Sequence, residues 1–153
     1  MTQRLTSSTS SIPARLKLLG FANYREYLDS EHWQEFRKKF FSKSAVCKNL
    51  RSKFGELRCQ FCHKSAVLHL HHRTYKRLGA EHLSDVVLIC ADCHQKSHER
   101  HKLNPRNGLW SATNQVGRKK RKIRQAKARR LRLGVYARRK ARRRTLREAA
   151  HEN

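Results

Sequence analysis

Apolar side chains recur at helical spacing over residues 30–55. The apolar positions are Trp33, Phe36, Phe40, Cys47, Leu50 and Phe54. The intervals of 3, 4, 7, 3 and 4 residues indicate one amphipathic helix whose apolar stripe lacks a member at Lys43. Ser30 is suited to cap the start of this helix, and Gly55 is suited to end it. Because Cys47 lies on the apolar stripe, we expect a buried thiol there rather than a metal ligand.

Shorter apolar segments predict the remaining elements. A helical region begins at Pro13, and a loop is expected over residues 73–85. The expected strands are residues 57–59, 66–70 and 86–89. Residues 93–101 contain no helix breaker and predict a helix that stops at Asn104 and Pro105.

Four of the five cysteines form two Cys-x-x-Cys pairs, which are Cys59 with Cys62 and Cys90 with Cys93. Four thiolates at this spacing can hold one structural Zn²⁺ tetrahedrally, and His63 or His94 could replace one of them as a ligand. The 27 residues between the pairs exceed the length of a simple zinc ribbon. We therefore expect the pairs to clamp the base of an inserted functional segment. Metal-type pairing also indicates a reducing compartment.

Histidines lie within and directly after this segment. His94 and His98 are four residues apart on the expected helix and share one face, which is a chelating arrangement. His71 and His72 are adjacent, so on a strand they point to opposite faces. One of them can bind a metal while the other faces a substrate water. The alternative is a solvated histidine cluster on a basic surface.

The chain becomes strongly basic after Gly117. From Arg118 to Arg147, 17 of 30 residues are Lys or Arg and none is acidic. The other residues favour a helix, with a break expected at Gly134. Charge repulsion should keep this segment largely unfolded in water until phosphates neutralise it and allow a helical tail.

The net charge of +26 predicts a polyanionic partner. Double-stranded DNA is the first candidate, RNA is possible, and an anionic membrane surface is the weaker alternative. No apolar run approaches membrane-spanning length. The predicted location is therefore the cytoplasm, in association with nucleoid or phage DNA. The candidate nucleic-acid contacts are Arg73, Arg77, Lys119, Arg121, Arg129, Arg130, Arg138, Arg139, Arg142 and Arg143.

These patterns divide the 153 residues into five parts. They are a disordered leader (1–12), a helical N-terminal region (13–56), a metal-binding module (57–103), a linker (104–117) and a basic nucleic-acid-binding tail (118–153). The leader has a second interpretation as a mitochondrial transit peptide, because the first acidic residue is Glu26.

Two stretches of the chain resemble the HNH (His-Asn-His) nuclease family, in its four-cysteine zinc-knuckle form. They are Leu68–Glu81 (LHLHHRTYKRLGAE) and Leu83–His94 (LSDVVLICADCH), the second followed by His98. The resemblance covers residues 57–101, about a third of the chain. It implies an α+β fold with a small ββα-metal (His-Me finger) module clamped by the four-cysteine zinc site, between an N-terminal helical region and a C-terminal basic helical tail.

The resemblance also implies roles for individual residues. His71 and His94 would bind one catalytic divalent cation (Mg²⁺, Mn²⁺, Ni²⁺ or Zn²⁺), with His98 as third ligand. His72 would be the general base for the attacking water, which suits a neutral imidazole near pH 7. Asp85 stands where the family often has Asn. Its carboxylate can only accept hydrogen bonds, so it would hold the loop by accepting backbone N–H bonds or orient His72 directly.

The expected function is that of a metal-dependent DNA endonuclease that leaves 5′-phosphate and 3′-hydroxyl ends. The alternative is a non-catalytic, zinc-stabilised DNA- or RNA-binding protein, which the charge alone would explain. A zinc-stabilised interaction domain without nucleic acid is a third interpretation that the basic tail disfavours. The sequence predicts neither the target site nor the oligomeric state.

Overall fold

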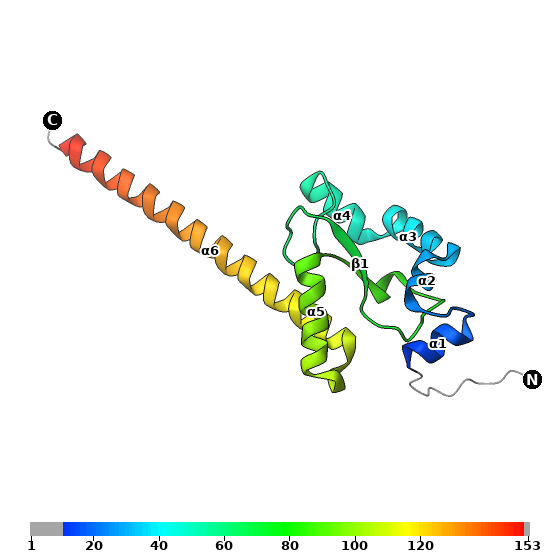
Figure 1. Ribbon diagram of the computed structural model, residues 1–153. Helices are drawn as coiled ribbons and strands as arrows, with labels where there is room; N and C mark the ends of the chain where they lie inside the picture. The colour runs from blue at the N-terminus through cyan, green and yellow to red at the C-terminus, as the bar shows by residue number, and fades with distance from the viewer. Residues whose placement is uncertain (1–10, 152–153) are drawn as a thin grey trace, which may run out of the picture.

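The computed structural model describes residues 11–151 and combines helices with one small antiparallel sheet (Figure 1). The helices are α1 (Ile12–Leu18), α2 (Tyr24–Asp29), α3 (Glu31–Lys43), α4 (Ala45–Phe54), α5 (Ala91–Leu103) and α6 (Gly108–His151). The strands are β1 (Leu68–His72) and β2 (Val86–Cys90), and two short 3₁₀ turns cover Leu83–Asp85 and Pro105–Asn107. The expected leader, residues 1–12, lies outside the described residues except for its last two.

The single helix expected over residues 30–55 is in fact two helices, α3 and α4. Ser44 separates them with an extended backbone (φ −64°, ψ 126°). An unbroken helix would have placed Lys43 on the buried stripe, whereas the bend at Ser44 turns the apolar faces of both helices to the same core. Gly55 ends α4 in the left-handed conformation (φ 73°), as predicted. Cys47 is fully buried, which confirms its expected place in the core.

The two faces of the sheet have different neighbours. Strands β1 and β2 pair antiparallel, with Leu70 opposite Leu88 and His71 opposite Val87. Leu70 and Leu88 pack into the core that the N-terminal helices build from Tyr27, Trp33 and other aromatic residues. Val87 packs on the opposite face, with the cysteines. Since side chains alternate along a strand, His71 and His72 lie on opposite faces, as the sequence predicted.

The expected strands are only partly correct. Residues 86–89 do form a strand, and the strand expected over 66–70 lies at Leu68–His72. Residues 57–59 are not a strand. The backbone there turns on itself instead: the Cys59 amide donates to the Lys64 carbonyl, and the His63 amide donates to the Cys59 carbonyl. These local bonds shape a tight turn, which meets β2 through Gln60: its N–H donates to the Leu88 carbonyl, and its side-chain oxygen accepts from the Leu88 N–H.

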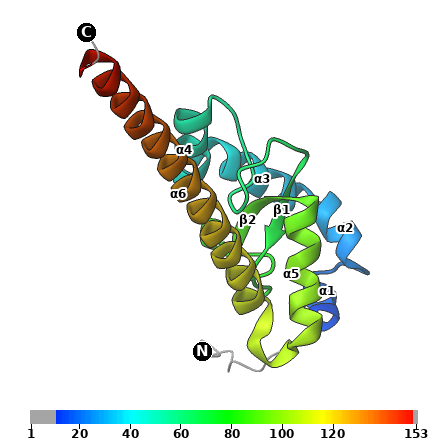
Figure 2. The same cartoon turned by 90° about the vertical axis from the view of Figure 1, so that its left-hand side faces the viewer.

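Helix α6 replaces most of the expected linker and runs through Gly134 without the predicted break. Its first turns are anchored because Leu109, Ala112 and Val116 are buried, and α6 contacts α5 there. One glycine costs a helix only about 1 kcal/mol, which its strong helix-forming neighbours offset. Beyond this anchor α6 projects away from the other elements (Figures 1 and 2).

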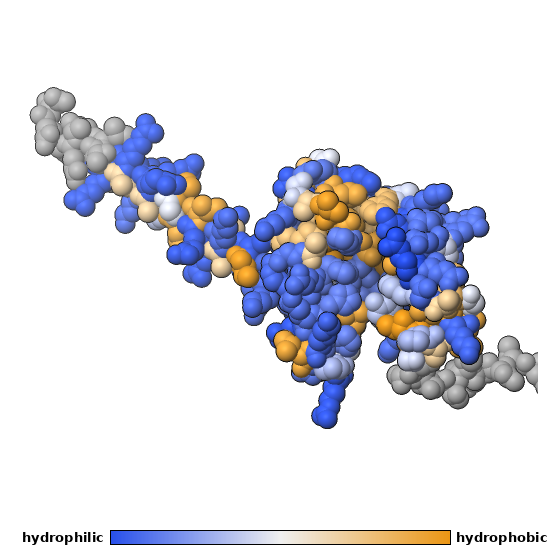
Figure 3. All heavy atoms as spheres, in the orientation of Figure 1, coloured by the Kyte–Doolittle hydropathy of each residue, from blue (hydrophilic) through white to orange (hydrophobic). Residues whose placement is uncertain are grey.

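The projecting part of α6 is strongly basic, and its few apolar side chains, among them Leu131, Leu133 and Val135, are exposed as well. From Gln125 to Arg144 every side chain is exposed, with only Gly134 partly covered. Figure 3 shows mainly hydrophilic residues along it, with a few scattered apolar ones. Among the described helices, none has the length and hydrophobicity needed to cross a membrane.

Candidate functional site

The four cysteines of the two pairs come together as one group, here called the cysteine cluster. Their sulfur atoms all lie within 4.8 Å of one another. Cys62 Sγ and Cys90 Sγ are 3.7 Å apart. Tetrahedral zinc with Zn–S bonds of about 2.3 Å separates its sulfurs by about 3.8 Å, so the cluster has the dimensions of a structural zinc site. All five cysteines of the chain are free of disulfide bonds.

Local hydrogen bonds favour a thiolate in the cysteine cluster. A hydrogen bond from Cys93 is the main reason that the pKa of Cys59 falls to about 4, and backbone N–H groups of Cys62, Cys90 and Phe61 act in the same direction. Burial opposes them. Thiolate is the form that binds zinc, so Cys59 is the cysteine best prepared for it. The hydrogen bond to Cys59 raises the pKa of Cys93, and burial raises the pKa of Cys62.

A second group, the histidine cluster, joins the sheet to α5. His71 comes from β1, and His94 and His98 come from successive turns of α5. Their ligand nitrogens lie within 4.8 Å of one another. The ring centroids are 4.7 Å apart for His71 and His94, and 4.9 Å for His71 and His98. Three imidazoles on one side can hold a cation and leave further coordination positions open.

All three imidazoles of the histidine cluster favour the neutral, metal-binding form. Burial is the main cause that lowers the pKa of His71 to about 2, and the neighbouring His94 and His98 lower it further. Burial also lowers the pKa of His94 and of His98. The Nε2 atom of His71 lies 3.3 Å from the Thr113 hydroxyl, so α6 also reaches the histidine cluster.

The histidine cluster opens into a cavity of about 580 Å³. Consecutive residues from Val67 to His72 line it, so it follows the edge of β1 that carries no neighbouring strand. Side chains from both faces of β1 reach such an edge. His72 therefore borders the same cavity as His71, although the two residues point to opposite faces of the sheet.

The His72 ring is held by hydrogen bonds at both nitrogens and by two stacked aromatic rings. Its Nδ1 lies 2.8 Å from the Tyr24 hydroxyl, and its Nε2 lies 3.2 Å from Glu81 Oε1. The ring stacks on Trp33 with centroids 4.6 Å apart and on Tyr75 at 5.4 Å. The imidazole is thus fixed in position and in direction.

Glu81 is a site residue that sequence reasoning missed. Its carboxylate also accepts hydrogen bonds from the Tyr27 hydroxyl and from His32. Burial raises its pKa, but the hydrogen bonds from His72, His32 and Tyr27 outweigh this effect and lower the pKa to about 2. The one signal in the sequence was that Glu81 is the sole acidic residue between Glu56 and Asp85.

The ionised Glu81 determines the tautomer of His72. A carboxylate only accepts hydrogen bonds, so Nε2 of His72 carries the proton and Nδ1 is the basic atom. Burial raises the pKa of Tyr24, so its hydroxyl stays protonated and donates to Nδ1. The pair resembles the carboxylate–imidazole arrangement that orients a general base.

Asp85 makes no hydrogen bond to His72. It is fully buried, accepts the His82 backbone N–H at 2.9 Å and pairs through both oxygens with Arg77. Of the two roles considered for Asp85, this geometry matches the loop-holding one. The carboxylate on His72 comes from Glu81 instead, because the loop between the strands folds back over the aromatic core.

The two loop arginines considered for phosphate binding are both engaged within the fold. Arg73 stacks over Trp110, 3.8 Å from the ring centroid, and donates to Asn114. Arg77 pairs with Asp85, and its side chain is 44% exposed, so part of its guanidinium still faces solvent. The other expected contacts are exposed residues of α6: Lys119, Arg121, Arg129, Arg130, Arg138, Arg139, Arg142 and Arg143.

Comparison of the chain with protein-family models, with curated proteins and with solved structures found no match. A functional assignment therefore depends on the geometry of the two ligand clusters, on the residues around His72 and on the charge of α6.

Proposed function

We propose that this protein is a metal-dependent endonuclease of the HNH type that hydrolyses phosphodiester bonds in DNA. The observation that carries the proposal is that one cavity is bordered both by histidines that can bind a metal and by a histidine that can act as a base. The histidine cluster can hold a cation, and His72 with Glu81 forms an oriented base beside it. A protein that used metal only to stabilise its fold would need the cysteine cluster alone.

The order of elements supports a ββα-metal module. Strands β1 and β2 are antiparallel, α5 follows β2 directly, and the ligands stand on β1 and α5. The cysteine cluster lies where β2 passes into α5, because Cys90 ends β2 and Cys93 stands in the first turn of α5. In this proposal zinc closes the module and keeps α5 in register with β1.

In the proposed reaction, His72 accepts a proton from the attacking water at Nδ1. The Tyr24 hydroxyl already donates to that atom, so the proton arrives through Tyr24 or directly once that hydroxyl has swung aside. Glu81 stabilises the imidazolium that forms. Water bonds to phosphorus, the bond from phosphorus to the 3′ oxygen breaks, and the 3′ oxygen takes a proton from solvent, so that 5′-phosphate and 3′-hydroxyl ends result. A divalent cation bound by His71, His94 and His98 would stabilise the charge on the phosphate and on the leaving oxygen.

Cleavage of supercoiled plasmid tests the proposal. Full-length protein is incubated with DNA and Mg²⁺, Mn²⁺ or Ni²⁺, with and without chelator. We expect metal-dependent nicking that falls by about 10²- to 10⁴-fold in His72→Ala, the range for loss of a general base. His101→Ala is the matched control, because His101 lies one turn beyond His98 and does not border the cavity.

DNA binding without cleavage under every metal would favour the second candidate, a non-catalytic zinc-stabilised DNA- or RNA-binding protein. The observation that favours this candidate is α6, whose exposed residues from Gln125 to Arg144 include no acidic side chain. Such a helix binds phosphates whether or not a nuclease site stands beside it.

A further inference from the structure

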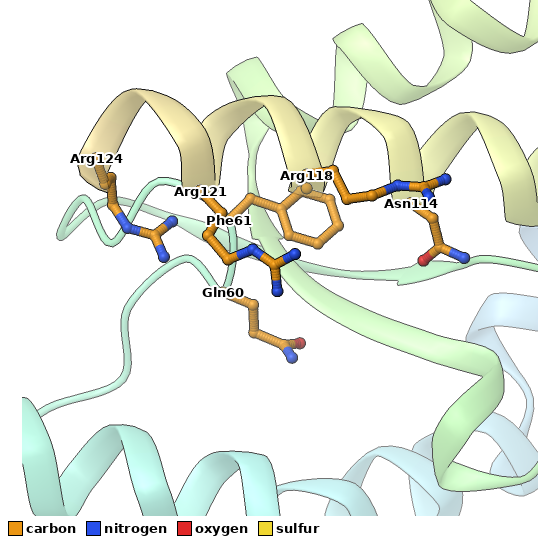
Figure 4. A pocket seen from close by; sticks show the side chains of 7 residues that line it. Gln60, Phe61, Asn114, Arg118, Arg121 and Arg124 are labelled. Carbon is orange, nitrogen blue, oxygen red and sulfur yellow. The ribbon is translucent and has the colours of Figure 1, made fainter. Parts of the chain in front are cut away.

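A second cavity, here called the arginine groove, lies where α6 passes the loop that carries Cys59 and Cys62 (Figure 4). Its volume is about 430 Å³. It is lined by Gln60, Phe61, Asn114, Gly117, Arg118, Arg121 and Arg124. Gly117 lets the helix approach closely, because a Cβ atom there would lie 2.8 Å from the Phe61 ring.

Three arginines line one side of the groove at intervals of three residues, which places them along one face of α6. Figure 4 shows Arg121 and Arg124 pointing from α6 toward the loop that carries Gln60. No carboxylate lines the groove, and within the described part of the chain no acidic residue pairs with these three guanidinium groups. One nitrogen of Arg124, Nη1, is buried without any hydrogen-bond partner. The fold itself therefore supplies no acceptor for this part of the Arg124 guanidinium.

The two amides of the groove also present donors. The oxygen of Gln60 accepts the Leu88 backbone N–H at 2.6 Å, and the oxygen of Asn114 accepts a hydrogen bond from Arg73. Both partners can only donate, so the orientation of each amide is fixed. The NH₂ groups of Gln60 and Asn114 are left to donate to a ligand. The side chains of the groove therefore offer donors to a ligand.

We infer that the arginine groove binds a phosphate of the nucleic-acid backbone, an inference that rests on the proposed function of the protein. Guanidinium forks match the paired oxygens of a phosphodiester, and the side-chain donors of the groove match an acceptor-only ligand. The basic helix that continues from the groove favours a long polyanion over an isolated anion. The groove also adjoins the candidate site, since Asn114 lines the groove and the preceding Thr113 contacts His71.

A pair of matched substitutions tests the inference. Gln60→Glu keeps the oxygen that accepts from Leu88 and replaces the outward donor by a negatively charged acceptor. Gln125→Glu makes the same chemical change on α6 outside the groove. Binding of full-length, zinc-loaded protein to a fluorescein-labelled DNA duplex is measured by fluorescence anisotropy at fixed salt, without a second divalent cation. We expect Kd to rise about tenfold for Gln60→Glu and by less than about twofold for Gln125→Glu.

Because Gln60 lies beside a zinc ligand, a second pair of variants tests the groove through the helix alone. Arg118→Gln with Arg121→Gln should weaken binding more than Arg129→Gln with Arg132→Gln, which removes the same charge farther along α6. The inference would be overturned if Gln60→Glu weakened DNA binding no more than Gln125→Glu, and the Arg118/Arg121 variant no more than the Arg129/Arg132 variant. The loss of affinity would then reflect net charge alone. Tighter binding of polyglutamate than of the duplex, equally sensitive to Gln60→Glu, would overturn it in favour of an acidic protein partner.

The binding test of the arginine groove and the cleavage test of the nuclease can give different results. The anisotropy measurement involves no cleavage, so the groove can pass its test in a protein that fails to cut DNA. Conversely, metal-dependent nicking by Gln60→Glu protein with wild-type affinity would uphold the nuclease and refute the groove.

Discussion

Glu81→Gln should destabilise the fold by about 3 kcal/mol at neutral pH. The side chain of Glu81 is 1% exposed, so solvent screens its hydrogen bonds little. Its pKa falls from 4.5 to about 2 in the folded protein. One pKa unit corresponds to about 1.36 kcal/mol, which gives about 3 kcal/mol for the ionised form. Gln keeps the shape of the side chain but loses that charge.

The pH dependence of this effect has a definite sign. A carboxylate with a lowered pKa stabilises the folded state above its ordinary pKa, and the contribution is lost as the pH falls through the folded-state value. The difference in unfolding free energy between wild type and Glu81→Gln should therefore be constant from pH 8 to pH 5. It should shrink between the ordinary pKa of 4.5 and about pH 2.

Urea denaturation followed by circular dichroism, with both proteins saturated with zinc, measures this difference. Glu99→Gln is the matched control, because Glu99 is exposed on α5 and its only described partner is Gln95; the change should stay within about 0.5 kcal/mol. A difference below 1 kcal/mol for Glu81→Gln at pH 7, or one that grows on acidification, would refute the reasoning. If the nuclease proposal holds, the same variant should cut DNA about 10- to 100-fold more slowly, since His72 loses its orienting partner.

Three further predictions concern the metals and α6. Chelation of zinc should abolish cooperative unfolding of the module that the cysteine cluster closes, and a chelated protein that melts like wild type would contradict a structural role. His71→Ala should remove an exchangeable-metal event in titration calorimetry while one zinc stays bound; loss of both metals would mean that the clusters are not independent. Deleting residues 125–153 should reduce the slope of log K against log salt by about 0.9 for each lost phosphate contact, and an unchanged slope would exclude contacts from this part of α6.

Local spacing in the sequence was sufficient to predict the cysteine cluster and the shared face of His94 and His98, whereas His71 joined them only through the resemblance to the HNH family. The two Cys-x-x-Cys pairs and the four-residue step from His94 to His98 specify geometry over short distances, and the structure brings each set together. The alternation of His71 and His72 followed in the same way from strand geometry. Each of these predictions required only that a short element form where its pattern indicated.

Long-range contacts account for what was missed. Glu81 reaches Tyr27 and His32, 54 and 49 residues earlier in the chain, so no local pattern connects them. The bend at Ser44 was hidden because a gap of one apolar position is compatible with a continuous helix. The sequence did not predict a continuous α6, because repulsion between its basic side chains was considered alone. The buried residues Ala112 and Val116 fix the start of the helix.

Helix α6 is the element that connects the separate parts of the molecule. At its start Thr113 contacts the histidine cluster, and two turns later Lys120 pairs with Asp92 beside the cysteine cluster, at 2.9 Å. Between them Gly117 brings Phe61 against the helix and closes the arginine groove. A polyanion bound along the exposed part of α6 would thus be attached to an element that contacts the histidine cluster and lies beside the cysteine cluster. Loss of either cluster should therefore alter how α6 is anchored, and binding should depend on zinc even where no zinc ligand touches nucleic acid.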